Sequence, residues 1–323
     1  MPPEFVSAPA LNVEFSLVPI QTPSLVIVGA GRVGRALGRA LHQRGWQIGA
    51  VVTRSQESAR AAVHAVGAGN PKSQLDASAL AADVILITTP DRAIAPVARD
   101  LARLLMQDSI VGRGLPAQAG FNRDKKATQE RRLQPLAGVT ILHTNGALDR
   151  SVLAPLERLG AATGSLHPLQ TFGRGALPQL AGCICAIEGA PRALRAARRI
   201  ARELGCIPVK IAAKDKPAYH AAGALAAGHV LAIVEAATRI LLASGFTRKQ
   251  AVRALLPLTR QTLTNFERLG PNAAWTGPLA RGDLVTVKKH ESALRKFPRE
   301  YRDAYRAISQ LALRVLADKR RGK

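Results

Sequence analysis

The chain has little cysteine, few acidic residues and no metal-binding spacing. Only three of its 323 residues are cysteines, Cys183, Cys185 and Cys206, and none stands in a C-x-x-C pair. A disulfide framework and a zinc site are therefore not expected, and we predict no metal. The N-terminal sequence MPPEFVSAPALNVEF lacks a basic leader before an apolar core, which argues against a signal peptide. We expect a cytoplasmic protein.

Acidic residues are scarce: 22 Asp and Glu stand against 46 Lys and Arg, giving a net charge of +24. Clustered basic residues bind nucleic-acid phosphates. Here the arginines are dispersed along helical segments, and no zinc finger, RRM-like aromatic pair or helix-turn-helix spacing accompanies them. Two charge runs, 122–132 and 318–323, are expected to be solvated. We therefore do not predict a nucleic-acid partner, since charge alone bears on solubility and partners rather than on fold.

The longest apolar segment contains several polar and charged groups. It spans residues 218–245 and includes His220, His229, Glu235 and Arg239. A bilayer strongly disfavours such groups, so we predict a buried helix of a soluble protein and no membrane contact.

Strands and helices alternate from residue 24 to about residue 212. Expected strands are 25–28, 46–52, 83–88, 140–143, 183–188 and 206–211, and expected helices are 33–43, 56–66, 94–105 and 191–204. The run DVILIT at 83–88 is typical of a parallel strand covered on both faces. Beyond residue 212 only helical patterns follow. The sequence thus predicts an α/β protein with a doubly wound, mostly parallel sheet, followed by an all-helical C-terminal domain.

Two segments fall outside this alternation. Residues 1–23 carry five prolines and are expected to form an extension, and residues 107–138 combine glycines with dense charge and are expected to form a surface insertion. The expected domains are therefore 24–212, including that insertion, and 213–323.

The segment LVIVGAGRVGRALGRAL, residues 25–41, places G-x-G-x-x-G between an apolar strand and a helix. In this context Gly29 permits a tight turn, Gly31 allows the backbone to approach a pyrophosphate, and Gly34 allows close packing of helix on strand. The backbone N–H groups of Arg32 and Val33, at the start of the helix, are expected to face the phosphates. We therefore predict a Rossmann-type dinucleotide site.

The second strand bears on which dinucleotide binds. An NAD site usually has Asp or Glu about 20 residues beyond the loop. This chain reads AVVTRSQES and ends the strand with Thr53, Arg54 and Ser55. Arg54 could bind a 2′-phosphate, and the two hydroxyls could assist, which favours NADP. Alternatively, Arg54 is a surface residue and Ser55 only a helix N-cap.

The next loop follows the strand DVILIT. Ligands of open α/β sheets lie beyond the carboxyl ends of strands, so Thr88, Thr89 and Pro90 are expected to border the ribose and nicotinamide. Asp91 is expected to cap the following helix.

Several short motifs of this sequence resemble those of one protein family. They are HTNG (143–146), LHPLQTF (166–172), CAIEG (185–189), KPAYHAAG (216–223), LLPLTRQTLTN (255–265), TGPLARGD (276–283) and YRDAYRAI (301–308). Over residues 24–105 and 139–316 the chain resembles proteins that pair a Rossmann-like domain with a domain of unknown function, DUF2520. The resemblance implies kinship with 6-phosphogluconate dehydrogenase, pyrroline-5-carboxylate reductase and F420-dependent NADP reductase, and it suggests a homodimer because related enzymes dimerise through their helical domains.

The chain departs from that family at informative places. Asn145 replaces an expected serine, and Ala227-Gly228 replaces a Ser-Asn pair in the long helix. In related dehydrogenases an Asn on that helix approaches the substrate, so its loss bears directly on catalysis. Residues 107–138 also lie outside the family pattern.

Candidate proton donors are Lys216 and His220, which lie four residues apart and share one face of the long helix. His167 is a third candidate, following a strand-like turn, and Asn145 could orient a substrate carbonyl. The alternative is that His220 is a buried structural histidine and Lys216 a solvated first-turn residue. His143, at the end of an apolar strand, is expected to be structural.

The function that these features favour is an NADP-dependent oxidoreductase acting on a small carbonyl, imine or hydroxy compound in the cleft between the domains. A sensor that binds NADP or another nucleotide without turnover is the alternative. Substrate identity does not follow from the sequence.

Overall fold

The computed structural model describes residues 22–76, 81–110, 134–173, 175 and 178–321, and it divides into two compact units, residues 1–223 and 224–323. The predicted extension lies outside the described residues except for Thr22 and Pro23, and so does segment 111–133 of the predicted insertion. Of the rest of that insertion, 107–110 end helix α3 and Leu136 is fully buried in the core.

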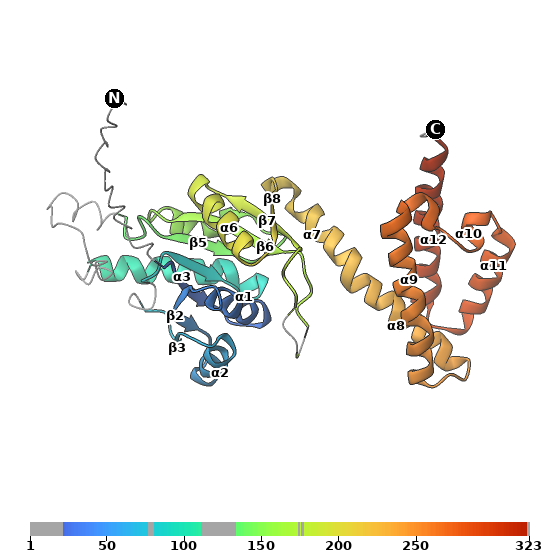
Figure 1. Cartoon of the computed structure of the whole chain (residues 1–323), viewed down its shortest axis with the longest axis horizontal. Helices are drawn as coiled ribbons and strands as arrows, with labels where there is room; N and C mark the ends of the chain where they lie inside the picture. The colour runs from blue at the N-terminus through green and yellow to red at the C-terminus, as the bar shows by residue number, and fades with distance from the viewer. Residues whose placement is uncertain (1–21, 77–80, 111–133, 174, 176–177, 322–323) are drawn as a thin grey trace, which may run out of the picture. The chain divides into compact units, whose positions relative to one another are not determined.

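The first unit contains one sheet of eight described strands (Figure 1). They are β1 (Ser24–Val28), β2 (Gln47–Val52), β3 (Asn70–Lys72), β4 (Val84–Ile87), β5 (Thr140–His143), β6 (Ala162–Pro168), β7 (Ile184–Gly189) and β8 (Ile207–Lys210). The spatial order is β3-β2-β1-β4-β5-β6-β7-β8. Strands β1 to β6 are parallel in the order of a Rossmann sheet, whereas β7 runs antiparallel to β6 and parallel to β8.

Helices cover both faces of this sheet because its strands alternate their apolar side chains. They are α1 (Arg32–His42), α2 (Gln56–Val66), α3 (Asp91–Ile110), α5 (Ala154–Glu157) and α6 (Pro191–Glu203), and α7 (Lys216–Ala224) follows β8. Leu25 and Ile27 of β1 join a core with α1, α2 and α6, whereas Val26 and Val28 join a core with α3 and α5. Each fully buried leucine or isoleucine contributes about 1.5–3 kcal/mol to folding. The predicted doubly wound, mostly parallel sheet is confirmed.

Two strands were not predicted. β3 has the sequence Asn-Pro-Lys and lies at the edge of the sheet, where proline is tolerated. β6 contains Gly164, at which a Cβ atom would lie 2.5 Å from the carbonyl oxygen of Glu188 in β7. His167 therefore lies inside a strand, paired with Ala186, and not after a turn as expected.

Every described element of the second unit is a helix, as predicted. Its helices are α8 (Val230–Ala243), α9 (Arg248–Ala274), α10 (Pro278–Arg281), α11 (Leu284–Ala293) and α12 (Arg299–Arg321), and a π-helical turn at Leu225–His229 joins α7 to α8. α9 is interrupted at Gly270, whose φ is +69°. Ala227 and Gly228, which replace the Ser-Asn pair of the resembled family, lie inside this π-helical turn.

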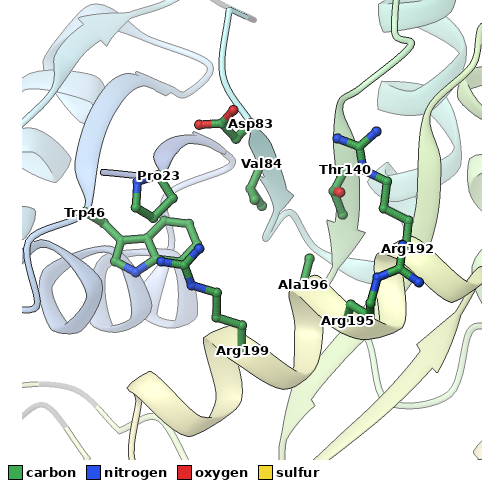
Figure 2. A pocket seen from close by; sticks show the side chains of 9 residues that line it. All are labelled: Pro23, Trp46, Asp83, Val84, Thr140, Arg192, Arg195, Ala196 and Arg199. Carbon is green, nitrogen blue, oxygen red and sulfur yellow. The ribbon is translucent and has the colours of Figure 1, made fainter. Parts of the chain in front are cut away.

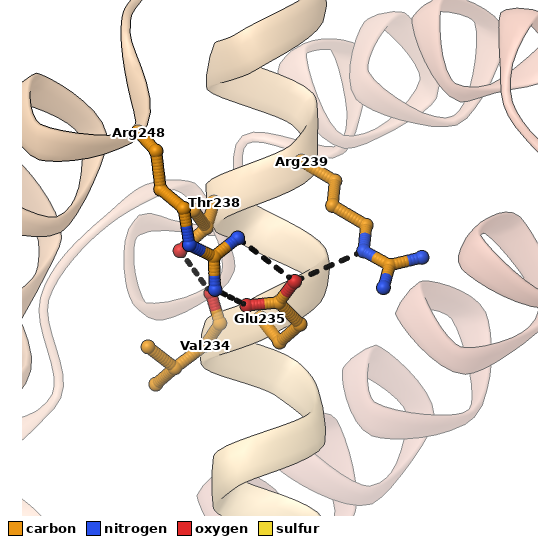
Figure 3. Close-up of polar contacts among 5 residues, drawn as sticks. All are labelled: Val234, Glu235, Thr238, Arg239 and Arg248. Atoms are coloured by element: carbon orange, nitrogen blue, oxygen red, sulfur yellow. Dashed lines mark hydrogen bonds and ion pairs between the residues drawn. The ribbon is translucent and has the colours of Figure 1, made fainter.

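An ion-pair cluster joins α8 to the start of α9 (Figure 3). Arg248 donates to both carboxylate oxygens of Glu235, at 2.8 and 3.2 Å, and Arg239 donates at 3.0 Å. The hydrogen bonds from Arg248 and then Arg239 lower the pKa of Glu235 to about 2. This contact lies at the surface, where such pairs contribute little individually.

The apolar helical segment differs from its prediction. The continuous helical stretch Ala213–Ala243 has a mean hydropathy of 1.6, and by length and composition it could cross a membrane. Only 6% of its most apolar window is buried, and Leu231 is 70% exposed. The prediction that this helix is buried is therefore wrong for the described chain.

Candidate functional site

The glycine loop between β1 and α1 has the geometry of a phosphate cradle. Gly29 has φ of +88°, and Gly34 would place a Cβ 2.3 Å from the hydroxyl oxygen of Thr88. At Gly31, the N-cap of α1, a Cβ would meet nothing within 4 Å, so the space above this residue is open. No side chain caps the helix, which leaves the N–H groups of Arg32 and Val33 directed to that space.

The end of β4 completes this corner. The Thr88 hydroxyl donates to the carbonyl of Gly29 at 2.5 Å, which fixes the loop against the neighbouring strand. The hydroxyl of Thr89 is buried and has no hydrogen-bond partner among the described residues. A buried polar atom without a partner is rare. Thr89 packs against Gly29, where a Cβ would lie 2.3 Å from its Cγ2, so this buried hydroxyl lies beside the glycine loop, and Pro90 follows at the exposed start of α3.

The end of β2 shows Ser55 as a helix N-cap and Arg54 at the surface, and the role of Arg54 towards a 2′-phosphate stays a prediction. Ser55 is the N-cap of α2 and accepts the N–H of Ser58 at 3.2 Å, and the Thr53 hydroxyl donates to the Ser55 carbonyl at 2.9 Å. Arg54 between them is exposed and forms no ion pair with any described residue. Its guanidinium is therefore free to meet a phosphate. Asp91 is the first residue of α3.

A second cluster lies at the carboxyl ends of β5 and β6, centred on Lys216. This lysine is 0% exposed, although it is the first residue of α7. Its ammonium group donates to the Ser165 hydroxyl at 2.8 Å and to the Asn145 carbonyl at 3.3 Å. Burial lowers the pKa of Lys216, opposed by the nearby carboxylate of Glu188. Lys216 is thus a buried link between a loop and a strand, and not a solvated residue.

The HTNG segment forms a tight loop after β5. The Asn145 side-chain oxygen accepts the N–H groups of Ala147 and Leu148, at 2.7 and 2.6 Å. His143 accepts the Asn145 N–H on Nδ1, at 3.2 Å, and its Nε2 lies 3.2 Å from the Asp149 carbonyl. His143 is fully buried, in agreement with a structural role, and the Asn145 oxygen is engaged by its own loop.

Two histidines face each other across Gly146. Their ring centroids, in His167 and His220, lie 5.8 Å apart, and a Cβ at Gly146 would meet both rings within 2.9 Å. The phenol of Tyr219 lies 3.0 Å from Nδ1 of His167. Both histidines are half-buried, so this face is the part of the cluster open to a reactant. Three of the four predicted catalytic side chains, with the loop that carries the fourth, therefore gather in one place.

The sequence interpretation missed Tyr219, Ser165 and Glu188. Tyr219 lies three residues after Lys216 and so shares its helix face, a signal present in the sequence. Glu188 accepts the backbone N–H of Arg150 at 2.9 Å and lies 3.5 Å from the Ser165 hydroxyl. Its pKa is raised by burial, against the effect of Lys216. Among the described residues, no group of three or more His, Cys, Asp or Glu side chains could hold a metal ion.

Burial of His143 and His167 predicts that the fold loses stability in acid. Burial first, then Lys216, lowers the pKa of His143 to about 4, and burial first, then His220, lowers the pKa of His167 to about 4. The unfolded chain therefore binds more protons below pH 6.5, and the free energy of unfolding should fall by about 1.4 kcal/mol per pH unit for each histidine between pH 6.5 and 4.

Urea unfolding between pH 7 and 4 measures this slope. His64→Gln, at an exposed position of α2, should keep the wild-type slope, and His143→Gln should reduce it. A free energy of unfolding that is flat from pH 6.5 to 4.5 would contradict the assignment of buried, neutral imidazoles.

The sheet order and the glycine loop define a Rossmann-type α/β fold, with an open corner at Gly31. Residues 24–112 match the family described as NADP oxidoreductase, coenzyme F420-dependent, and residues 183–312 match DUF2520. The chain therefore matches both domains, one after the other, as the sequence resemblance predicted. Among curated proteins, none matches it.

Solved structures agree with this assignment of the fold. The chain is similar to a candidate NADP oxidoreductase from Bacteroides fragilis at 20% identity, covering 91% of this chain and 98% of that one, with a TM-score of 0.68. It is similar to a reductive aminase from Aspergillus terreus, solved with NADPH and ethyl-5-oxohexanoate, at 18% identity, 91% and 94% coverage and a TM-score of 0.62. A pyrroline-5-carboxylate reductase from Coxiella burnetii matches at 14% identity, 91% and 98% coverage and a TM-score of 0.52.

Proposed function

We propose that this protein is an NADP-dependent oxidoreductase that reduces a small carbonyl or imine compound, or oxidises the corresponding hydroxy compound or amine. The observation that carries the proposal is the polar cluster of Lys216, His167 and His220 at the same sheet edge as the glycine loop. The glycine loop follows β1, and the cluster lies at the ends of β5 and β6, which run parallel to β1 in the same sheet.

We assign a different role to each of His220, His167 and Lys216, according to how deeply its side chain is buried. Bound NADPH supplies the hydride. His220, half-buried and adjacent to Gly146, is the group positioned to give a proton to the substrate heteroatom. His167, beside it, is kept neutral by burial and by the charges of His220 and Lys216, so it can hydrogen-bond a substrate without adding charge. Lys216 positions the 145–146 loop through the Asn145 carbonyl.

Activity is tested by following NADPH oxidation with a panel of ketones, aldehydes and cyclic or open imines. We expect turnover of at least one carbonyl or imine, lost in His220→Ala and retained in His229→Ala, a histidine of the π-helical turn. NADP binding without turnover of any compound would instead support the nucleotide sensor.

Selectivity for NADP is proposed to rest on Arg54. Removing its guanidinium should weaken NADP binding about 10–100-fold, since a charge-assisted phosphate contact is worth roughly 1.5–3 kcal/mol, and should leave NAD binding unchanged. Isothermal titration of Arg54→Gln with both nucleotides measures this. Arg60→Gln, an equally exposed arginine of α2, is the matched control. Equal losses for both nucleotides would remove Arg54 from 2′-phosphate recognition.

We further propose a cytoplasmic homodimer formed by the helical unit. Its helices expose large apolar side chains, including Leu231 at 70%, Leu258 at 64% and Leu263 at 57%. Exposed apolar surface of this kind is typical of interfaces. Sedimentation equilibrium will show whether the mass is that of two chains.

A further inference from the structure

A cavity lies between helix α6 and the sheet, and Figure 2 shows the side chains that line it. Its volume is about 430 Å³, within the range of small-molecule sites. Val84 and Thr140, the first residues of β4 and β5, lie on one side of it, and helix α6 lies on the other. It therefore borders the amino ends of these strands, whereas the dinucleotide corner lies at their carboxyl ends.

Three arginines of α6 line this cavity. Arg192, Arg195 and Arg199 are spaced three and four residues apart, so they form one stripe along the helix. Ala193 and Ala197, on the neighbouring face, are fully buried against the sheet. The helix is thus fixed by its alanine face while its arginine stripe faces the cavity.

Part of the charge in the cavity wall is already paired. Arg199 donates to Glu203 at 2.7 Å, and its guanidinium lies 5.6 Å from the ring centre of Trp46, whose indole N–H also donates to Glu203. Asp83 accepts both the N–H and the hydroxyl of Ser24, at 2.9 and 2.7 Å. These contacts position Trp46, Arg199 and Asp83 in the cavity wall.

The remaining two arginines are available to a ligand. Arg195 is exposed and forms no ion pair with any described residue. Arg192 donates through one nitrogen to the carbonyl of Gly138, an uncharged acceptor, and retains its positive charge and its other donors. Two such guanidinium groups, one helical turn apart, match the fork geometry of phosphate and carboxylate groups.

We propose that this cavity binds a small anion carrying at least two negative charges, a phosphate or polycarboxylate compound, held by Arg192 and Arg195. A concave site of this volume suits a metabolite-sized molecule better than a polymer. The site does not depend on the proposed reaction, because it lies away from the glycine loop and the Lys216 cluster.

Calorimetric titration with pyrophosphate and, separately, with citrate tests this proposal, at constant ionic strength so that screening does not change. We expect saturable binding of at least one anion, which also identifies phosphate or carboxylate as the preferred group. Arg195→Gln should weaken it by about tenfold or more. Arg198→Gln, which removes the same charge from the same helix outside the cavity lining, should change it less than about twofold.

Two further variants show whether the anion binds at this cavity. In Trp275→Phe protein, Trp46 is the only tryptophan, so its fluorescence should report saturation at the cavity with the same midpoint. In Gly31→Val protein, anion binding should persist, which separates it from the dinucleotide loop. No saturable binding in the millimolar range would overturn the proposal, as would equal losses in Arg195→Gln and Arg198→Gln. Displacement of both anions by polyglutamate at far lower concentration would indicate a docking surface for an acidic protein instead.

Discussion

Replacing Gly31 by valine is expected to weaken NADP binding at least about 100-fold without changing the fold. The Cβ position at Gly31 is open, and its φ of −74° is accessible to any residue, so the substitution creates no clash within the protein. The added side chain instead fills the space through which phosphate oxygens would reach the free N–H groups of α1. Several charge-assisted hydrogen bonds would be lost together.

Titration calorimetry and thermal unfolding measure the two halves of this prediction. Gly173→Val is the matched control, because Gly173 also has open space around its Cβ position and no positive φ. It should bind NADP like the wild type. Gly34→Ala should behave differently from Gly31→Val and lower the unfolding temperature, since its Cβ would lie 2.3 Å from the Thr88 hydroxyl. Wild-type NADP affinity in Gly31→Val would exclude this loop as the nucleotide site.

Replacing Lys216 by methionine is expected to reduce turnover on the order of 100-fold and to raise the pKa values of two histidines. The ammonium charge of Lys216 lowers the pKa of both His143 and His167, although burial is the larger cause for each. Without that charge both values should rise from about 4 toward 6.5, only part of the way because the rings stay buried. Turnover falls because the 145–146 loop loses its contact with α7.

NMR titration of the histidine side chains measures the pKa shifts independently of activity, and a steady-state assay measures the loss of turnover. Lys214→Met is the control, because Lys214 is exposed just before α7. It should leave both the histidine titrations and the rate unchanged. Unaltered pKa values in a folded Lys216→Met protein would show that the ammonium group does not act on these rings.

The parts of the fold that the sequence predicted are those defined by local pattern. Helix α2 and strand β5 have the predicted limits, and the strand–glycine–helix corner is where the spacing indicated. The short edge strand β3 and strand β6 lack apolar alternation, because an edge position and the close approach of β7 at Gly164 determine their composition. Pairing with a neighbouring strand, rather than propensity, defines these two elements.

The sequence named individual candidate residues of the site, but it did not predict the contacts between residues distant along the chain. Lys216 and His220 were named as candidates from their spacing on one helix, yet the buried Lys216 donates to Ser165, a residue 51 positions away that the helix spacing does not indicate. Glu188 reaches the same network only because β7 runs antiparallel to β6, a reversal without a local signal. The arginine cavity of α6 is likewise formed by strands distant in sequence.

The most direct test of the account is calorimetric titration of the wild-type protein with NADP and with NAD. The open space at Gly31, the uncapped start of α1 and the exposed Arg54 predict saturable binding of one NADP per chain, at least about tenfold tighter than NAD. Failure of both nucleotides to bind at millimolar concentration would contradict the assignment of this corner as a dinucleotide site.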